Sequence, residues 1–134
     1  MPKSENAFKS RVVALLREAE PMWVVLPIQD VRTNGTPDLS VSGNGRTTWW
    51  EFKDCRPTFI NRGIQLRTCR RLAAASYCRY VLYVTLPVRG TWIVHPRDMP
   101  TANPANASGI VDVETSRTGH DHRWVVERIR EAHV

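Results

Sequence analysis

A short β-hairpin in the first half of the chain constrains the fold more than any other feature of the sequence. Two strand patterns, 38–42 and 47–53, flank the dipeptide Asn44-Gly45, which is the strongest short signal for a two-residue hairpin turn. With this turn, paired residues have numbers that add up to 89, and a four-residue loop around the same dipeptide gives the same pairing. Asp38 is then expected directly across from Glu51, with their Cβ atoms about 5 Å apart on one face of the sheet.

Strand alternation decides which neighbours share that face. Lys53 lies on the same face as Glu51, whereas Trp50 and Phe52 point the other way and are expected in the core. Two acids that face each other across an antiparallel pair repel, and a bound divalent cation would remove that repulsion. Asp38, Glu51 and Lys53 therefore form a cluster, for which the alternative interpretation is ordinary surface charge on an exposed hairpin.

The chemistry of this cluster points to phosphodiester hydrolysis. Carboxylate oxygens without His or Cys indicate a hard ion such as Mg²⁺ or Mn²⁺. Such an ion polarises a phosphate and lowers the pKa of a bound water, and a nearby lysine can orient that water or stabilise the developing charge. We therefore interpret Asp38, Glu51 and Lys53 as catalytic residues, with the two acids also acting as metal ligands.

The hydrophobic pattern of the whole chain predicts an α/β domain with the element order αβββαββ and a C-terminal tail. Apolar residues recur with helical spacing after Ser4, a good helix cap, and Pro27 within the next strand indicates an edge position or a bulge. The expected elements are a helix at 4–19, strands at 23–32, 38–42 and 47–53, a helix at 59–77, strands at 80–86 and 91–95, a loop at 100–109 and a helix at 121–133.

Length and composition fit this architecture. A chain of 134 residues, 42% of them hydrophobic, supports one domain over 1–134, with the core at about 4–95 and a C-terminal loop and helix at 96–134. The longest uncharged apolar stretch, 80–88, is too short to cross a membrane, and the first residues do not resemble a secretory signal. Three cysteines without metal-ligand spacing indicate a reduced compartment, so we expect a cytoplasmic protein, while a bacterial or a phage origin stays open.

The positive charge of the chain is concentrated in its middle third. The net charge is +6, and the 43 residues at 55–97 contain eight arginines and no acid. A solvated basic face is the simpler explanation, but this imbalance favours a polyanionic partner, with nucleic acid first. Arginines in the second helix and just before it are expected to bind phosphates without reading the base sequence. These are Arg56, Arg62, Arg67, Arg70 and Arg71.

The spacing of the acidic cluster resembles the signature of the PD-(D/E)xK nuclease superfamily. Pro37-Asp38 is followed after twelve residues by Glu51-Phe52-Lys53. The preceding Gly35-Thr36-Pro37-Asp38 resembles the start of the active-site strand in archaeal-type Holliday junction resolvases and virus-type replication-repair (VRR-NUC) nucleases. The resemblance covers about residues 4–86. It implies a restriction-endonuclease-like αβββαβ core, in which helices flank a mixed sheet and the motif lies on a hairpin.

The resemblance also implies roles for residues outside the motif. Glu5 in the first helix and the backbone carbonyl of Phe52 are implied as metal ligands, and Gln65 in the second helix as a catalytic residue near the site. Glu5 has a simple alternative role, because an acid in the first turn favours the helix dipole. The sequence departs from the VRR-NUC pattern at 73–76, Ala-Ala-Ala-Ser, where that group has a glycine, so the subgroup stays open.

Tryptophans and histidines add little to the predicted site. The five tryptophans are more typical of core and interface positions than of stacking platforms, although alternation places Trp49 on the face of Glu51. His120 and His122 flank an aspartate near the last helix but have no metal-ligand spacing, so no role is assigned to them.

The leading hypothesis is a Mg²⁺-dependent DNA endonuclease that recognises a structure, such as a branch or a Holliday junction, more than a sequence. A catalytically inactive nucleic-acid-binding module of the same fold is the first alternative, although the intact Asp38, Glu51 and Lys53 argue against it. A restriction-type nuclease ranks lower, because a chain of 134 residues has little spare surface for base-reading elements. The small size also favours a homodimer on a two-fold substrate.

Overall fold

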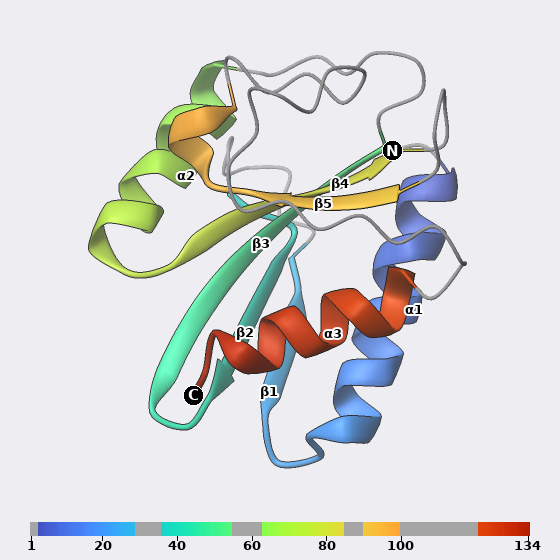
Figure 1. The fold of residues 1–134 in the computed structure, drawn as a ribbon. Helices are drawn as coiled ribbons and strands as arrows, with labels where there is room; N and C mark the ends of the chain where they lie inside the picture. The colour runs from blue at the N-terminus through green and yellow to red at the C-terminus, as the bar shows by residue number, and fades with distance from the viewer. Residues whose placement is uncertain (1–2, 29–35, 55–62, 85–89, 100–120) are drawn as a thin grey trace.

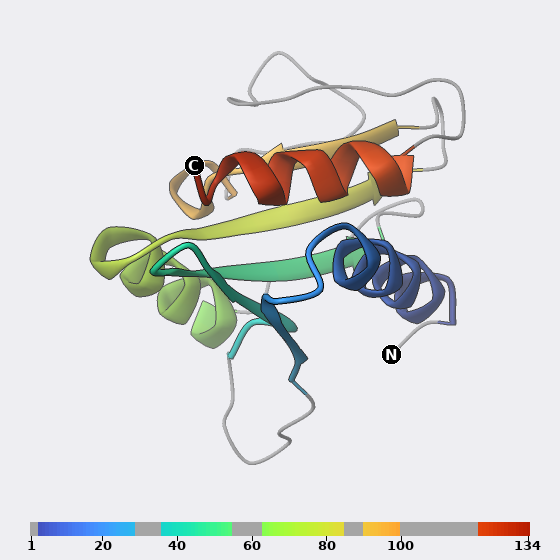
Figure 2. The same ribbon diagram turned by 90° about the horizontal axis from the view of Figure 1, so that it is seen from below.

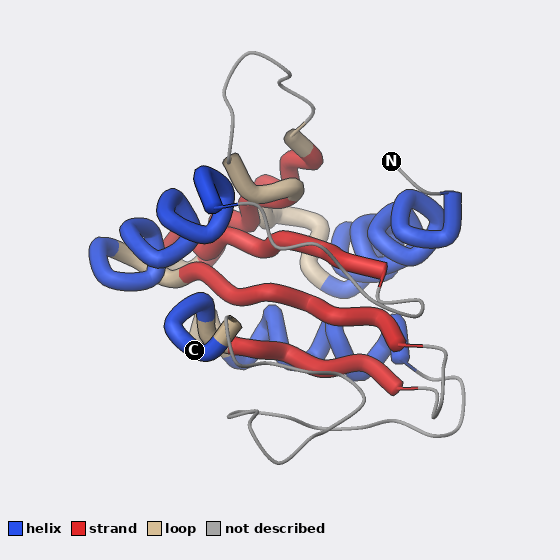
Figure 3. The backbone as a smooth tube through the Cα atoms, turned by 90° about the horizontal axis from the view of Figure 1, so that it is seen from above, coloured by secondary structure: helices blue, strands red, loops and turns tan. Residues whose placement is uncertain are grey.

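A five-stranded mixed sheet organises the chain, and its strands lie side by side in sequence order (Figures 1 and 3). The computed structural model describes residues 3–28, 36–54, 63–84, 90–99 and 121–134. Strands β3 and β4 are parallel, and the other neighbouring pairs are antiparallel. The strands are β1 (Val24–Pro27), β2 (Leu39–Gly43), β3 (Arg46–Asp54), β4 (Cys78–Val84) and β5 (Gly90–Val94).

Helices cover both faces of this sheet. α1 (Lys3–Ala19) and α3 (Asp121–Glu131) pack together on one face, whereas α2 (Gly63–Ala75) and the short 3₁₀ helix η1 (Pro96–Asp98) pack on the other. Figures 1 and 2 show α1 and α2 on opposite sides of the strands, with α3 next to α1. None of the helices in the described residues is long and apolar enough to span a membrane. The described residues form one α/β domain with a mixed sheet flanked by helices, as predicted.

Each face of the sheet has its own apolar cluster. Alternation along β3 sends Trp50 and Phe52 to the side of α1 and α3, as predicted, and both side chains are almost fully buried. The helices on this side contribute Phe8, Val12, Val13, Leu16, Val125, Val126, Ile129 and Ala132. The cluster on the α2 side consists of Cys69, Cys78, Tyr80, Leu82, Trp92, Val94 and Met99.

The β2–β3 hairpin has the predicted register. Leu39 pairs with Trp50 and Gly43 with Arg46, so that the paired numbers add up to 89 along the ladder. Asn44 and Gly45 have φ angles of 54° and 76°, as a type I′ turn requires. The predicted turn and pairing are therefore confirmed.

The outer edge of β1 is protected against pairing with a further strand. β1 is the first strand of the sheet, which confirms the edge position predicted from Pro27. A proline is tolerated there because it has no N–H to donate to a further strand. The carbonyl oxygen of Val25 accepts a hydrogen bond from Nη2 of Arg17 at 2.7 Å. Few free backbone groups are then left for edge-to-edge association. Val24 and Leu26, on the opposite face from Val25, each keep 52% of their surface exposed.

The end of the chain holds the hairpin turn in place. Nη1 of Arg46 donates to the carbonyl oxygen of Ala132 at 2.6 Å. The His133 ring, only 3% exposed, donates from Nδ1 to the carbonyl oxygen of Gly43 at 2.9 Å. Its Nε2 lies 2.8 Å from Oγ1 of Thr48. These bonds fix the hairpin that carries the candidate site relative to α3.

Several element ends differ from the predicted ones. β1 covers four residues where the pattern predicted 23–32; one more hydrogen bond, from the N–H of Ile28 to the carbonyl oxygen of Asp38 at 2.7 Å, follows it, and 29–35 lie outside the described residues. β4 begins at Cys78, before the predicted residue 80, because the parallel pairing with β3 starts there. The predicted helix start at 59 and the loop at 100–109 also lie outside the described residues.

Candidate active site

The three residues of the predicted catalytic cluster lie together at one end of the β2–β3 hairpin. Asp38 directly precedes β2, and Glu51 and Lys53 are two residues apart on one face of β3. The backbone N–H of Asp38 donates to Oε1 of Glu51 at 3.1 Å. Nζ of Lys53 is 3.2 Å from Oε2 of the same carboxylate. The hairpin register thus brings these side chains together, as predicted.

Both carboxylates are also tied to the backbone. Oδ2 of Asp38 accepts a hydrogen bond from the N–H of Phe52 at 2.9 Å, while Glu51 accepts from the N–H of Asp38. These contacts lie just beyond the last ladder pair, Leu39 with Trp50, and so close the open end of the hairpin. Among the described residues, Oδ1 of Asp38 has no hydrogen-bond partner, which leaves it able to contact a cation.

Burial makes Glu51 an unusual glutamate. It is 1% exposed, whereas the Lys53 side chain keeps 18% of its surface and Asp38 is half-buried. Burial first, and then the negative charge of Asp38, raise the pKa of Glu51 from 4.5 to about 8, although Lys53 acts in the opposite direction. Such a group needs a nearby cation to ionise fully at neutral pH, and perturbed carboxylates of this kind gather at functional sites.

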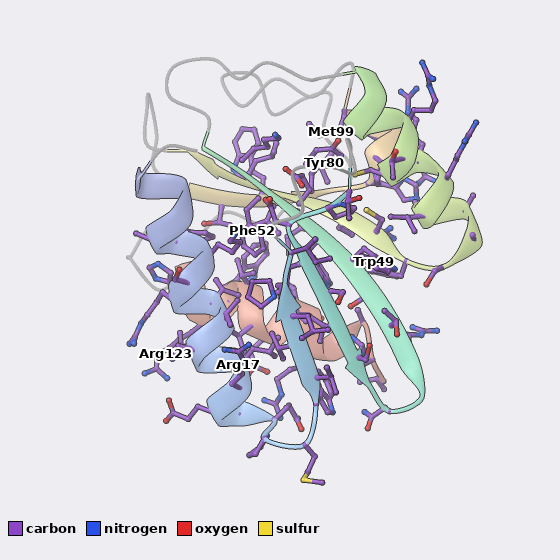
Figure 4. The ribbon with its side chains drawn as sticks, turned by 180° about the vertical axis from the view of Figure 1, so that it is seen from behind. Arg17, Trp49, Phe52, Tyr80, Met99 and Arg123 are labelled. Atoms are coloured by element: carbon purple, nitrogen blue, oxygen red, sulfur yellow. The ribbon has the colours of Figure 1, made fainter. Side chains whose placement is uncertain are left out.

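The wall beside Glu51 is uncharged. Tyr80 of β4 is the direct neighbour of Glu51 in the parallel ladder and is fully buried, so burial raises the pKa of its phenol. Cys69 of α2 and Cys78 of β4 are buried free thiols in the same cluster, and the hydrogen bond between their side chains lowers the pKa of Cys69. In Figure 4, Tyr80 lies toward α2 and Phe52 toward α1. On this side of the sheet, the charged group in contact with the Glu51 carboxylate is the ammonium group of Lys53.

Four other predicted site residues cannot be placed next to this cluster. α1 carries Glu5 and α2 carries Gln65, but their side chains lie outside the described part of the structure. Arg56 and Arg62 lie wholly outside it. Phe52 is in β3 beside Glu51, and its carbonyl as a metal ligand stays a prediction.

The arginines of α2 form the exposed patch that their spacing predicted. Arg67, Arg70 and Arg71 are exposed and line an open hollow of about 480 Å³ together with Leu66 and Ala74. Nε of Arg70 donates to a backbone carbonyl of η1 at 3.4 Å, so this side chain leans toward η1. The described residues place no acid within ion-pair distance of the three guanidinium groups.

The donor set of the cluster fits a hard divalent cation. Within the described residues, no group of three or more His, Cys, Asp and Glu side chains is gathered in one place. Asp38 and Glu51 supply two carboxylates, and Mg²⁺ is commonly bound by one or two carboxylates with waters in the remaining positions. A cation here would also offset the repulsion that raises the pKa of Glu51. Mg²⁺ or Mn²⁺ therefore fits these oxygens better than a softer metal would.

The burial of two polar residues, Tyr80 and Lys9, was not predicted from the sequence. The neighbour of Glu51 on β4, Tyr80, was not recognised, because the sequence gives no register for a parallel pair joined by a crossover helix. Lys9 in α1 is 4% exposed, and its position next to Phe8 on the buried helix stripe could have revealed it. His122 packs its ring on Phe8, with centroids 4.7 Å apart, on the face away from the cluster, while His120 is outside the described residues.

Comparisons with known proteins add no further constraint. A scan of the sequence against models of protein families found no match, and a search of curated proteins also found none. A function for this chain therefore rests on its own residues and their geometry.

Proposed function

We propose that this chain is a Mg²⁺- or Mn²⁺-dependent DNA endonuclease of the PD-(D/E)xK type with a restriction-endonuclease-like core. The observation that supports it most directly is the contact of Asp38, Glu51 and Lys53 at one end of a hairpin. The element order from α1 to β4, helix, three strands, helix and strand, is also the order that the sequence resemblance implies. Order and contacts are consistent with one active site on β2 and β3.

The two carboxylates hold the metal ion in this proposal. Asp38 and Glu51 bind it, with the carbonyl of Phe52 and the carboxylate of Glu5 as further ligands. When bound, the ion polarises the scissile phosphate and lowers the pKa of a water ligand. Glu51 loses its proton on metal binding, because a protonated carboxyl is a poor ligand.

Lys53 supplies the positioned cation. Its Nζ, 3.2 Å from Oε2 of Glu51, is held on the face where the phosphate binds, and an ammonium group has three N–H donors. The donors that Glu51 does not use can align the attacking water or bind a phosphate oxygen as negative charge builds there. Gln65 of α2 assists near the same phosphate.

The arginine patch gives a reason to expect a nucleic-acid substrate. Arg67, Arg70 and Arg71 have no acidic partner among the described residues, so their charge is available to phosphates, together with that of Arg56 and Arg62. Phosphate contacts carry no base information, which favours a nuclease that selects a DNA structure such as a branch or Holliday junction. A homodimer on such two-fold DNA, inside the cell, completes the proposal.

A binding module without catalysis is the second candidate, and one observation favours it. The hydrogen bonds of Asp38 and Glu51 to backbone N–H groups close the end of the hairpin, which is a structural task that needs no metal. In that case the arginines would still bind DNA, and Asp38, Glu51 and Lys53 would contribute to folding only. Catalysis is the property that separates the two candidates.

The test is a cleavage assay with defined substrates. The protein is incubated with labelled Holliday junction, flap, duplex and single-stranded DNA, and with RNA, in Mg²⁺, Mn²⁺, Ca²⁺ or EDTA. We expect cleavage of branched DNA with Mg²⁺ or Mn²⁺ and none in EDTA. Ca²⁺ should support binding without cleavage, because its looser coordination sphere suits this chemistry poorly.

Variants make the result specific to the cluster. Asp38→Asn should reduce cleavage by at least about a hundredfold, whereas Glu127→Gln, which removes an exposed acid of α3, should leave it unchanged. Undiminished cleavage in EDTA, or by Asp38→Asn, would rule out the metal mechanism. DNA binding without cleavage of any substrate would put the binding module first.

A further inference from the structure

Trp49 lies next to the carboxylate cluster, on the face of β3 that is turned toward α2. It precedes Glu51 by two residues and shares its face, so the two Cα atoms are about 6.5 Å apart. The indole is half-buried, because part of it packs against the apolar cluster under α2. Figure 4 shows Trp49 between β3 and α2. On its other side in the sheet, Trp49 is paired with Ser40 of β2.

The half of the sheet formed by β1 and β2 carries no charged residue; Ser40 of β2 is buried on it, and the exposed side chains are those of β1. Ser40 of β2 lies directly opposite Trp49, and Leu26 of β1 lies opposite Ser40. Val24 continues the same face of β1, and both apolar side chains of β1 on this face are 52% exposed. Neither β1 nor β2 contains Asp, Glu, Lys or Arg. A phosphate placed over these strands would find no cation on them.

We propose that Trp49 is a substrate-binding residue that stacks on an unpaired nucleobase beside the phosphate held at Asp38, Glu51 and Lys53. The proposal rests on the nuclease function proposed above and names its substrate class. A nucleotide joins a flat, uncharged base to an anionic phosphate. The indole of Trp49 can stack on the base, and the neighbouring metal ligands and Lys53 can hold the phosphate.

The base has to be unpaired, since both of its faces are covered inside an intact duplex. An indole can stack only on a base that is single-stranded, displaced at a branch, or flipped out. Branch points, flaps and single strands present such bases at low energetic cost, and every base has a face that can stack. Trp49 would thus select unpaired DNA without selecting a base sequence.

The test compares Trp49→Leu with Trp49→Phe. Both keep an apolar side chain against the cluster under α2, but only Phe keeps an aromatic ring. Binding is measured in Ca²⁺, so that no cleavage is needed, to a splayed arm and a single strand that carry 2-aminopurine, and to a matched duplex. Trp49→Leu should lose at least about fivefold in affinity for the unpaired substrates, and Trp49→Phe should lose less. Affinity for the duplex should stay unchanged.

Several outcomes would overturn the proposal. These are equal affinities of wild type and Trp49→Leu for unpaired DNA, a loss that is equal for duplex and unpaired DNA, or a Phe variant as weak as the Leu variant. If Trp49→Leu does not fold, the 2-aminopurine signal of the wild-type complex decides, and an unchanged fluorescence on binding overturns the proposal.

Failure of the stacking role can be told apart from failure of the nuclease. A wild type that cuts branched DNA in Mg²⁺ at the same rate as Trp49→Leu overturns the stacking role and leaves the nuclease. A wild type that prefers unpaired DNA through Trp49 but cuts nothing overturns the nuclease and supports the stacking role. Absence of binding to any DNA overturns both.

Discussion

The Glu51 carboxyl lies in surroundings that disfavour its charged form. Its carboxylate is buried between the backbone N–H of Asp38 and the ammonium group of Lys53, with the Asp38 carboxylate nearby. The ammonium group of Lys53 and the N–H of Asp38 do not offset the effects of burial and of the Asp38 carboxylate. The pKa of Glu51 therefore rises to about 8. A metal ion would supply the missing positive charge.

Without metal, this arrangement should make the protein less stable as the pH rises. The pKa of Glu51 is about 8 in the folded protein and 4.5 in the unfolded chain, so folding takes up a proton between these values. The stabilising contribution is complete below about pH 4.5 and is lost as the pH rises through about 8. Relative to Glu51→Gln in EDTA, the free energy of unfolding of the wild type should fall by up to about 1.4 kcal/mol per pH unit.

Urea unfolding of both proteins across this pH range measures the effect. A difference between wild type and Glu51→Gln that stays constant would show that the pKa of Glu51 is not raised. Mg²⁺ affinity should show the opposite trend and increase up to about pH 8, because the metal must displace the proton of Glu51.

Substitutions of Lys53 and Asp38 should have different effects on metal and DNA binding. Lys53→Ala should keep most of the affinity for DNA, because this residue is assigned to chemistry. Asp38→Asn should lose metal binding but bind DNA at least as well, because a negative charge facing the phosphate is removed. Its amide oxygen can still accept from the N–H of Phe52, so the hairpin stays closed.

Both variants should reduce the cleavage rate by about 10²- to 10³-fold, which is the usual effect of losing one electrostatic or water-orienting group. Cleavage rates and DNA dissociation constants in Ca²⁺ separate the two roles. A rate close to that of the wild type for either variant would show that the shared face of Asp38, Glu51 and Lys53 is not an active site.

The hairpin that carries the site is held at its far end by the last residues of the chain. Nε2 of His133 lies 2.8 Å from the hydroxyl of Thr48, which also accepts a hydrogen bond from Nε1 of Trp50 at 2.8 Å. Nδ1 of His133 donates to the carbonyl of Gly43, so both ring nitrogens have partners. This network is buried, and each of its polar groups depends on the others.

Replacing His133 with Phe should therefore destabilise the protein by about 1–3 kcal/mol, because buried groups of Thr48 and Gly43 lose their partner. Val134→Ala is the control, since Val134 is fully exposed and should change stability by less than about 0.5 kcal/mol. Urea unfolding compares the two. If His133→Phe is as stable as the control, the turn is held without this network.

Contacts between residues close in the sequence could be predicted, whereas contacts between distant residues could not. The β2–β3 register follows from a two-residue turn, so the contact of Asp38 with Glu51 could be predicted from the sequence. The pairing of β3 with β4 depends on how the crossover helix α2 packs, which no local pattern records, so Tyr80 was not recognised. The bond of His133 to Gly43 joins residues 90 positions apart and also leaves no local signal.

At the scale of the whole molecule, the two faces of the sheet are covered unequally. α1 and α3 seal one face, whereas α2 packs on the other mainly over β4 and leaves Val24 and Leu26 of β1 half exposed. The candidate site lies on β3, between β2 and the strand β4 that α2 covers. The α2 arginines lie on the outer side of that helix. A nucleic acid bound at both the arginines and the candidate site would therefore contact α2 and β3.

Replacing Arg67, Arg70 and Arg71 together with Ala should test this arrangement. Affinity should fall for all DNA sequences alike, and the slope of log K against log salt should decrease by up to about three, since each phosphate contact releases about one counterion. α2 should stay folded, because these side chains are exposed and alanine is the best helix former. Arg123→Ala on α3 is the control for loss of a positive charge on the opposite face, and titrations at several salt concentrations measure both. An unchanged slope and affinity would mean that the three arginines contact only solvent, and the proposed phosphate contacts would then rest on Arg56, Arg62 and the cluster of Asp38, Glu51 and Lys53.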